Sequence, residues 1–267
     1  MKIVLWVGNE ANQKALANKI NAEYEVVGIV TETRVYKPKI TLLTFLEKVV
    51  EKVFLSSIGS AWGGMKTYYD RSFHDYPETA ILDAENINSQ NVYDFTKELN
   101  PDLIVISGTR IVKEKLLSLQ PSIGILNLHT GLSPYIKGGP NCTNWCISTE
   151  QFHLIGNTVM WVDLGIDTGN IVTTEFTDFT GDESLLEIHI KVMEHAHELC
   201  LKAIKHVANG KHANVQQDKV AKGLTYYTKQ WRLKNKIDLV RNFKKIKSVV
   251  KSGEMDRKRR KVTIIKI

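Results

Sequence analysis

The chain has 267 residues, of which 43% are hydrophobic and 24% charged, enough apolar material for one large globular domain and too much for a mainly disordered chain. The net charge is +7, but much of the excess lies between Arg241 and Lys266, so the body lacks the spread basic surface of a dedicated nucleic-acid binder. No apolar run approaches the roughly 20 residues that cross a bilayer, and the apolar start at residues 2–7 is too short for a secretory signal. We therefore expect a cytoplasmic protein without membrane insertion.

The first half of the chain alternates strand-like and helix-like segments. Apolar runs at residues 2–7 and 24–31 predict buried strands, with a helix over residues 12–20 between them. Apolar side chains at helical spacing predict a helix over residues 41–55. Residues 61–76 are rich in glycine and aromatic side chains and predict a loop. A further helix is expected from Asn88 to Leu99, where Asn100-Pro101 ends it.

The second half continues the alternation. Strands are expected at residues 102–107 and 123–127 around a short helix at 113–119, then at 154–164 and 170–176 before a long helix over 183–207. Strands alternating with helices predict an α/β fold, a doubly wound, Rossmann-like, mostly parallel sheet with helices on both faces.

After the long helix the composition changes. We expect a catalytic domain over residues 1–210 and a small basic C-terminal extension over residues 211–267, with an amphipathic stretch at 236–250 and a terminal strand at 262–267. The basic tail has three interpretations: a solvated segment, which we favour, a surface that attracts an anionic nucleotide sugar or membrane, or a nucleic-acid contact.

Ligands of doubly wound sheets bind beyond the carboxyl ends of the strands, which directs attention to residues 8–11, 107–111 and 128–140. Asn127 and His129 lie two positions apart at a predicted strand end, so their side chains project to the same side. Asp167 lies in a turn between glycines, from which it can reach back across the sheet end. An amide, an imidazole and a carboxylate suit acyl transfer, because they can bind a developing oxyanion and move protons without a Ser or Cys nucleophile.

Metal chemistry is not expected. Cys142, Cys146 and Cys200 are an odd number of cysteines without paired CxxC spacing, which argues against both a disulfide framework and structural zinc. Buried packing is the simpler interpretation of these side chains.

Two segments carry a family resemblance. Residues 127–138, NLHTGLSPYIKG, and residues 162–172, VDLGIDTGNIV, resemble the two signatures of formyltransferases that use 10-formyltetrahydrofolate. The resemblance covers roughly residues 2–210. It implies that Asn127 holds the formyl oxygen, that His129 acts as acid or base, and that Asp167 orients His129 and assists proton transfer.

The same resemblance implies a site for 10-formyltetrahydrofolate as co-substrate. Backbone groups of one segment would read the pterin ring, and a second loop would close the other side of the pocket. The cofactor-binding residues are thus expected to be Thr109, Arg110, Ile111 and Val112 on the first segment, and Asp163, Gly165 and Ile166 on the second.

Departures from the family pattern bear on the acceptor. Purine-pathway members have a glycine-rich phosphate-binding turn after the first strand, whereas this chain has Glu10 there, which disfavours glycinamide ribonucleotide. Methionyl-tRNA enzymes carry a barrel-like domain larger than the segment after Gly210. The resemblance then favours a nucleotide-linked amino sugar, such as a 4-amino-4,6-dideoxy sugar on UDP or dTDP, for O-antigen or other surface polysaccharide. Homodimers are common among such enzymes, so we expect one.

Five residues are expected to bind this acceptor. Arg71 would meet a diphosphate from the aromatic segment at 61–76, and the rest follow the His129 segment: Tyr135, Lys137, Gly138 and Asn141. Methionyl-tRNA and glycinamide ribonucleotide stay open as alternative acceptors, and two other interpretations stay open as well. One is an inactive basic protein that engages RNA on the same scaffold, and the other is hydrolysis of formyl-folate at a related site.

Overall fold

The computed structural model describes residues 1–33 and 42–267, and it contains one large sheet with the strand order β3-β2-β1-β4-β5-β7-β8. The first five of these strands pair in parallel, and β7 pairs antiparallel with both β5 and β8, so the predicted doubly wound, mostly parallel sheet is confirmed. The strands are β1 (Lys2–Gly8), β2 (Glu25–Glu32), β3 (Ala80–Ala84), β4 (Leu103–Ser107), β5 (Gly124–His129), β7 (Gly156–Trp161) and β8 (Ile171–Phe176).

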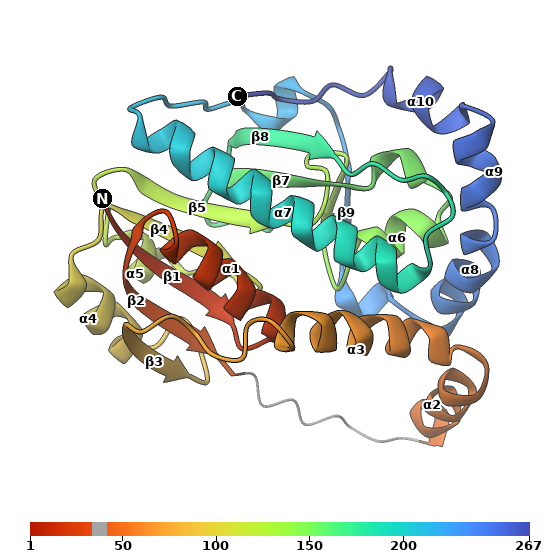
Figure 1. Cartoon of the computed structure of the whole chain (residues 1–267), viewed down its shortest axis with the longest axis horizontal. Coiled ribbons are helices and arrows are strands. Elements are labelled where there is room, and N and C mark those ends of the chain that lie inside the picture. Colours follow the sequence, from red (N-terminus) through yellow and green to blue (C-terminus); the bar gives the residue numbers. More distant parts are fainter. Residues whose placement is uncertain (34–41) are drawn as a thin grey trace.

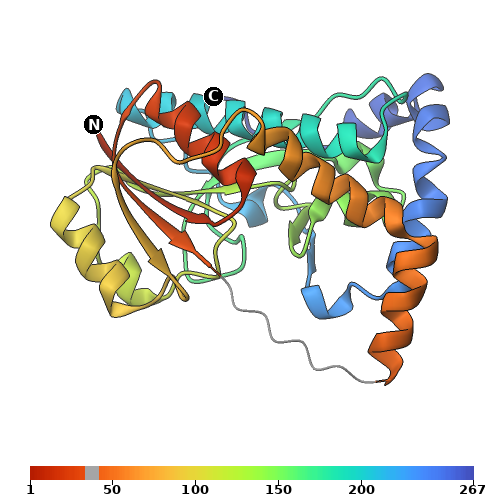
Figure 2. The same ribbon diagram turned by 60° about the horizontal axis from the view of Figure 1, so that its bottom comes forward.

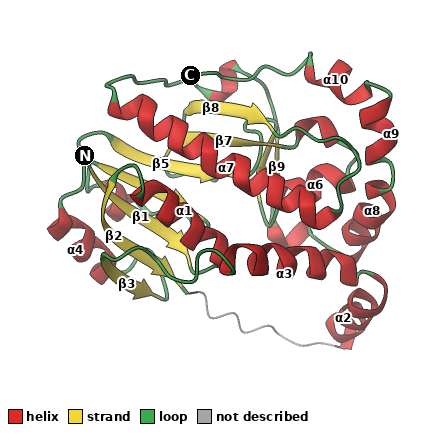
Figure 3. Cartoon of the chain, viewed as in Figure 1, coloured by secondary structure: helices red, strands yellow, loops and turns green. Residues whose placement is uncertain are grey.

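Helices cover both faces of this sheet (Figures 1, 2 and 3). On one face lie α1 (Ala11–Asn21), α3 (Ser56–Asp70) and α7 (Leu185–Ala208), and on the other lie α4 (Gln90–Leu99) and α5 (Glu114–Leu117). Successive side chains of β1 point to opposite faces of the sheet and pack against both helix layers. Leu5 packs with α1 and α7, whereas Trp6 packs with α4 and α5. Nearly every residue of β1 is therefore buried, which explains its continuous apolar run.

The prediction of a loop over residues 61–76 is wrong, because α3 occupies most of that segment and follows α2 (Leu42–Phe54) directly. Its buried side chains, Ala61, Met65 and Tyr69, recur every four residues on one helical face. Gly64 serves close packing, since an added Cβ would lie 3.0 Å from a methyl carbon of Leu186 on α7. One of the glycines that indicated a loop, Gly64, thus allows α3 and α7 to approach, whereas an added Cβ at Gly63 would meet nothing within 4 Å. Within the described residues α2 agrees with the helix expected at 41–55; residue 41 lies outside them.

Three smaller differences concern strands. β3 was not predicted, because most of its side chains are exposed at the sheet edge and form no buried apolar run. The strand expected at 154–164 is the shorter β7, preceded by a 3-10 turn, η1 (Phe152–Leu154). Residues 262–267 form no regular strand, although the Thr174 N–H donates to the Ile265 carbonyl at 2.8 Å.

The C-terminal segment lies against the body of the protein. It contains η2 (Gln217–Lys219), β9 (Leu224–Tyr226), η3 (Thr228–Gln230), α8 (Leu233–Phe243), α9 (Ile246–Lys251) and α10 (Glu254–Arg259). β9 pairs in parallel with β6 (Ile136–Gly138) as a second, two-stranded sheet. Leu239, Ile246 and Met255 share a hydrophobic cluster with Ile147 of α6 (Cys142–Ser148). The domain boundary at residue 210 stays a prediction, but residues beyond it contribute to a common core.

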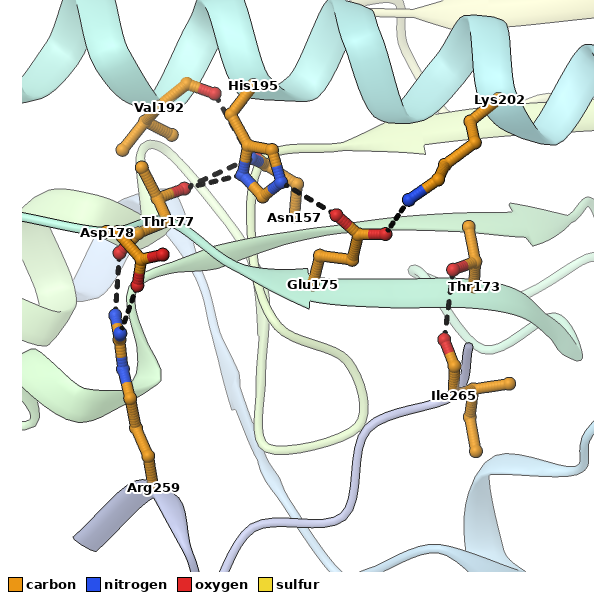
Figure 4. A network of polar contacts seen from close by, with 10 residues as sticks. All are labelled: Asn157, Thr173, Glu175, Thr177, Asp178, Val192, His195, Lys202, Arg259 and Ile265. Carbon is orange, nitrogen blue, oxygen red and sulfur yellow. Dashed lines mark hydrogen bonds and ion pairs between the residues drawn. The ribbon is translucent and has the colours of Figure 1, made fainter. Parts of the chain in front are cut away.

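A polar network ties α7 to β8 (Figure 4). His195 Nε2 lies 3.1 Å from a carboxylate oxygen of Glu175, whose other oxygen accepts a hydrogen bond from Lys202. The other ring nitrogen of His195 lies 3.1 Å from the side-chain amide nitrogen of Asn157 on β7. Burial raises the pKa of Glu175, but the hydrogen bonds from Lys202 and His195 outweigh that effect and hold it below its ordinary value. Figure 4 also shows Arg259 of α10 bonded to Asp178, just after β8.

Two further histidines of α7 are buried on its inner side. His189 is 3% exposed and His197 is 1% exposed. Burial lowers the pKa of His189 to about 4, and burial together with the nearby Lys19 charge lowers that of His197 to about 3. Both side chains are therefore neutral in the folded protein near pH 7.

No helix in residues 1–33 and 42–267 is long and apolar enough to cross a membrane.

We expect His189 and His197 to lower the free energy of unfolding as the pH falls. Between pH 6.5 and their lowered pKa values, the unfolded chain binds protons that the folded chain excludes, so the free energy of unfolding falls by about 1.4 kcal/mol per pH unit for each histidine. His189→Gln should reduce the fall measured by urea unfolding between pH 6.5 and 4.5 by about 2 kcal/mol. His212→Gln, at an exposed position, is the control. An unchanged pH dependence in His189→Gln would contradict the prediction.

Candidate active site

Three polar side chains meet beyond the carboxyl edge of the large sheet. Asn127 and His129 lie on the same side of β5 at its end, and Asp167 reaches them from the turn between β7 and β8. The Asn127 side-chain amide donates to Asp167 Oδ1 at 3.2 Å, and His129 Nδ1 lies 3.5 Å from Asp167 Oδ2. The side chains of His129 and Asp167 are 11% and 15% exposed, so they are largely withdrawn from water but still accessible. The structure thus brings together the three residues that the sequence analysis expected to be catalytic.

Backbone groups hold Asp167 in place. Its carboxylate accepts a hydrogen bond from the Gly138 N–H at 2.9 Å, and its backbone has a φ of 50°, in the left-handed region that few non-glycine residues adopt. The side-chain amide of Gln217 donates to the Asp167 carbonyl at 2.7 Å and to the Gly169 carbonyl at 2.8 Å. Sequence reasoning missed Gln217, which lies in no motif and no periodic segment and reaches Asp167 across 50 positions of the chain.

The imidazole of His129 is packed on its other side. His129 Nε2 lies 3.5 Å from the sulfur of Cys142, and that sulfur also lies 3.5 Å from the Gly138 carbonyl, which accepts its S–H. Gly131 lies against both side chains, since an added Cβ would be 2.4 Å from His129 Nε2 and 2.8 Å from Cys142 Sγ. The ring is thereby held between a carboxylate and a thiol, and only a residue without a side chain fits at position 131.

Burial raises the pKa of the Cys142 thiol well above its ordinary value, and the nearby Cys146 and Asp167 raise it further. The thiol beside His129 is therefore protonated and is not a nucleophile at neutral pH. This agrees with the expectation that acyl transfer here needs no cysteine. Cys142 and Cys146 are both buried in α6, as the simpler interpretation predicted.

The segment expected to read the pterin ring follows β4. The backbone N–H of Arg110 donates to the buried carboxylate of Glu32 at 2.8 Å, and its guanidinium lies 3.1 Å from the same carboxylate. The Ile111 carbonyl accepts from the Asn88 amide, and Val112 is buried in the core. The Thr109 hydroxyl donates to the Arg110 carbonyl at 3.0 Å. This segment is accordingly rigid, and its Ile111 side chain is half exposed.

The second segment expected to bind the folate, residues 163–167, is also held by hydrogen bonds. The Asp163 carboxylate accepts from the Gly165 N–H at 3.0 Å and from the Thr168 hydroxyl at 2.7 Å, which closes the turn. Leu164 is 60% exposed, while Ile166 is half-buried. Each of the two loops therefore presents one exposed branched aliphatic side chain. Such side chains suit the faces of a flat heteroaromatic ring, so the residues present fit a folate.

A cavity of about 520 Å³ lies beside the second loop. Its lining includes Asp163, Gly169, Trp161 and His212. Asn127, His129 and Asp167 do not line it. We therefore place the reacting groups at the open edge around Asp167 and not inside this cavity.

The residues expected to bind the acceptor have different surroundings. Gly138 contacts Asp167 directly, and the Lys137 ammonium lies 3.4 Å from the Gln217 side-chain oxygen, so both are near the site. Asn141 caps α6 by accepting from the Asn144 N–H, and the Tyr135 hydroxyl accepts from the Thr263 N–H. Arg71 is exposed at the C-terminal end of α3, and its contact with a diphosphate stays a prediction.

The fold and the arrangement at the sheet edge are those of an α/β enzyme for group transfer. Residues 1–204 match the formyl transferase family model, and the chain therefore belongs to the formyl transferase family.

The curated relatives that match this chain include methionyl-tRNA formyltransferases. The chain is 32% identical over 155 residues to a methionyl-tRNA formyltransferase of Clostridium botulinum, a match covering 58% of this chain and 46% of the relative. The chain thus spans about half the length of the curated relatives that it matches.

Solved structures share the fold at low sequence identity. A sugar N-formyltransferase of a Shewanella species is 16% identical with a TM-score of 0.57, covering 91% of this chain and 88% of that one. An N-formyltransferase of Helicobacter canadensis, in complex with folinic acid and dTDP-3-aminofucose, is 16% identical with a TM-score of 0.55, covering 91% and 81%. A phosphoribosylglycinamide formyltransferase of Bacillus halodurans is 21% identical with a TM-score of 0.54, covering 81% and 100%.

The buried thiols give a prediction that needs no substrate. Burial raises the pKa of Cys200 to about 12 and raises those of Cys142 and Cys146 as well, so the native protein should not react with a thiol reagent such as Ellman's reagent at pH 8 within minutes. Unfolding in guanidinium should expose all 3 cysteines to it. A rapid reaction of one thiol in the native protein would show that the cysteine concerned is not buried as described.

Proposed function

We propose that this protein is an N-formyltransferase that moves a formyl group from 10-formyltetrahydrofolate to the amino group of a nucleotide-linked amino sugar. The observation that carries this proposal is the contact of Asn127 and His129 with one carboxylate, Asp167, in a chain of the formyl transferase family. The finer assignment is a 4-amino-4,6-dideoxy sugar on UDP or dTDP, used in the cytoplasm for surface glycan synthesis.

The folate would lie between the two loops that present Ile111 and Leu164. When bound, it supplies an activated formyl group at the edge of the sheet. Because Glu32 and Asn88 hold the first loop, its orientation is set before the folate arrives. The rigid loops therefore serve to present the formyl carbon to the three polar side chains.

Asn127 supplies an oxyanion donor. A side-chain amide has two N–H groups, and the structure uses the Asn127 nitrogen to donate to Asp167 at 3.2 Å. The remaining N–H can donate to the formyl oxygen as it gains negative charge. The contact with Asp167 fixes which atom of the amide is the nitrogen and directs that nitrogen toward the site.

His129 would accept the proton that the acceptor amine loses, and Asp167 would assist it. The acceptor amine must be neutral to form the new bond to the formyl carbon, and it must lose a proton as that bond forms. The bond between the formyl carbon and the folate nitrogen would break, and the proton taken from the amine would replace the formyl group on that nitrogen. Imidazole is the side chain that ordinarily takes up a proton near pH 7. The Asp167 carboxylate, 3.5 Å from His129 Nδ1, stabilises the imidazolium that results.

The acceptor assignment draws on the end of β1. Glu10 is the N-cap residue of α1 and forms an ion pair with Lys66 of α3. An acceptor phosphate at this helix N-terminus would be repelled by that carboxylate, which argues against glycinamide ribonucleotide.

The basic C-terminal helices argue against a tRNA acceptor. Several of their cations already pair with carboxylates of the body, namely Lys236 with Glu51, Lys245 with Glu150, Lys247 with Asp182, and Arg259 with Asp178. A surface that binds phosphates by releasing counterions needs cations that are not paired in this way. The structural neighbours named as sugar N-formyltransferases support the sugar, whereas the relatives named as methionyl-tRNA formyltransferases support the alternative.

The first test is a formyl-transfer assay with 10-formyltetrahydrofolate and a panel of acceptors, scored by mass. The panel holds UDP- and dTDP-linked amino sugars, glycinamide ribonucleotide and methionyl-tRNA. We expect a formylated amino sugar, with kcat reduced on the order of 100-fold or more in Asn127→Ala and in His129→Ala. Formylation of methionyl-tRNA alone would refute the acceptor assignment, and formate release without a formylated product would indicate a hydrolase.

Gly131 provides a steric test of the same site. The Cβ of Gly131→Ala would lie 2.4 Å from His129 Nε2, so the ring must move, and kcat should fall at least tenfold. Gly139→Ala is the matched control, because its Cβ would meet only the Thr228 hydroxyl at 3.6 Å. Equal activity of the two variants would mean that His129 does not act from the position seen in the structure.

A further inference from the structure

We propose that Gln217, outside the part of the chain that matches the family model, is a positioning residue for Asp167. The proposal rests on the proposed function, since it assigns Gln217 a part in the chemistry of Asp167. Residues 1–204 carry the family match, so the inference adds to the site a residue from the C-terminal extension.

The contacts of Gln217 converge on the catalytic turn. Its side-chain nitrogen donates to the carbonyls of Asp167 and Gly169, at 2.7 and 2.8 Å, and thereby bridges two positions of one turn. Its side-chain oxygen accepts from the Lys137 ammonium at 3.4 Å. The residue is 7% exposed, so these bonds are shielded from competing water.

The bridged turn needs such support. Asp167 has a φ of 50°, a backbone conformation that is unfavourable for a residue with a side chain and persists only where surrounding contacts enforce it. The direction of the carboxylate follows from this backbone conformation. When the two carbonyls are held by one amide, Asp167 Oδ1 meets Asn127 and Oδ2 meets Gly138 and His129.

The chain on both sides of Gln217 is itself anchored. Two residues earlier, Val215 exchanges backbone hydrogen bonds of 2.8 and 2.9 Å with Ile171 at the start of β8. Further on, Tyr226 of β9 pairs with Gly138 of β6, whose N–H donates to Asp167. The C-terminal extension therefore supports the backbone of Asp167 through Gln217 and the partner of its carboxylate through Tyr226.

The test compares Gln217→Met, which keeps the shape and removes the amide, with Gln216→Met, the same change at the exposed neighbour. We expect Gln217→Met to lower kcat about tenfold while the KM values for folate and acceptor change less than twofold, with active sites counted by titration with a folate analogue. In an Asp167→Asn background the same change should lower kcat less than twofold, because Gln217 acts through Asp167. Where that background turns over too slowly, the split between kcat and KM decides.

A second measurement does not depend on activity. The Gly138 N–H donates to the Asp167 carboxylate, so its hydrogen exchange, followed by NMR, should be at least tenfold faster in Gln217→Met and unchanged in Gln216→Met.

Several outcomes would overturn the positioning role. These are an unchanged kcat, an equal loss in the wild-type and Asp167→Asn backgrounds, or unchanged exchange at Gly138. If the wild type formylated no nucleotide sugar, the acceptor assignment would fail. The hydrogen exchange at Gly138 would still test whether Gln217 positions Asp167.

Discussion

The carboxylate of Asp167 is the contact on which the rest of the site depends. Its two oxygens meet the amide of Asn127, the ring of His129 and the N–H of Gly138, which come from two different strands. A carboxylate buried to this degree is stabilised only by such hydrogen bonds, and each of them also fixes the partner. Moving this one group would disturb Asn127, His129 and the β6 strand together.

Much of the fold could be predicted because burial on both faces leaves a clear pattern. The continuous apolar run of β1 and the two-residue spacing of Asn127 and His129 follow from the geometry of a buried strand. α3 could not be predicted so easily, since its glycines, of which Gly64 packs against α7, obscure the period marked by Ala61 and Met65. β3 could not be predicted because an edge strand with exposed side chains has few apolar residues to indicate it.

The site shows the same division. The three residues expected to be catalytic lie in two local motifs, which the family resemblance marks and the topology brings together; their catalytic roles stay a prediction. Gln217 contacts Asp167 from 50 positions away in the chain, and nothing local to Gln217 marks it. Arg71 shows the converse, since its surroundings in the sequence indicated a ligand loop while the structure places it at the exposed end of a helix.

The pairing of β6 with β9 also bears on how the protein is made. Gly138 and Tyr226 are neighbours in a small sheet although 88 positions separate them in the chain. During synthesis, the large sheet has all of its strands once β8 has left the ribosome, whereas β6 has no partner until β9 follows. Closing so long a loop carries an entropic cost that only the completed contacts repay. Until β9 has been synthesised, β6 therefore lacks its strand partner, although every strand of the large sheet is already present.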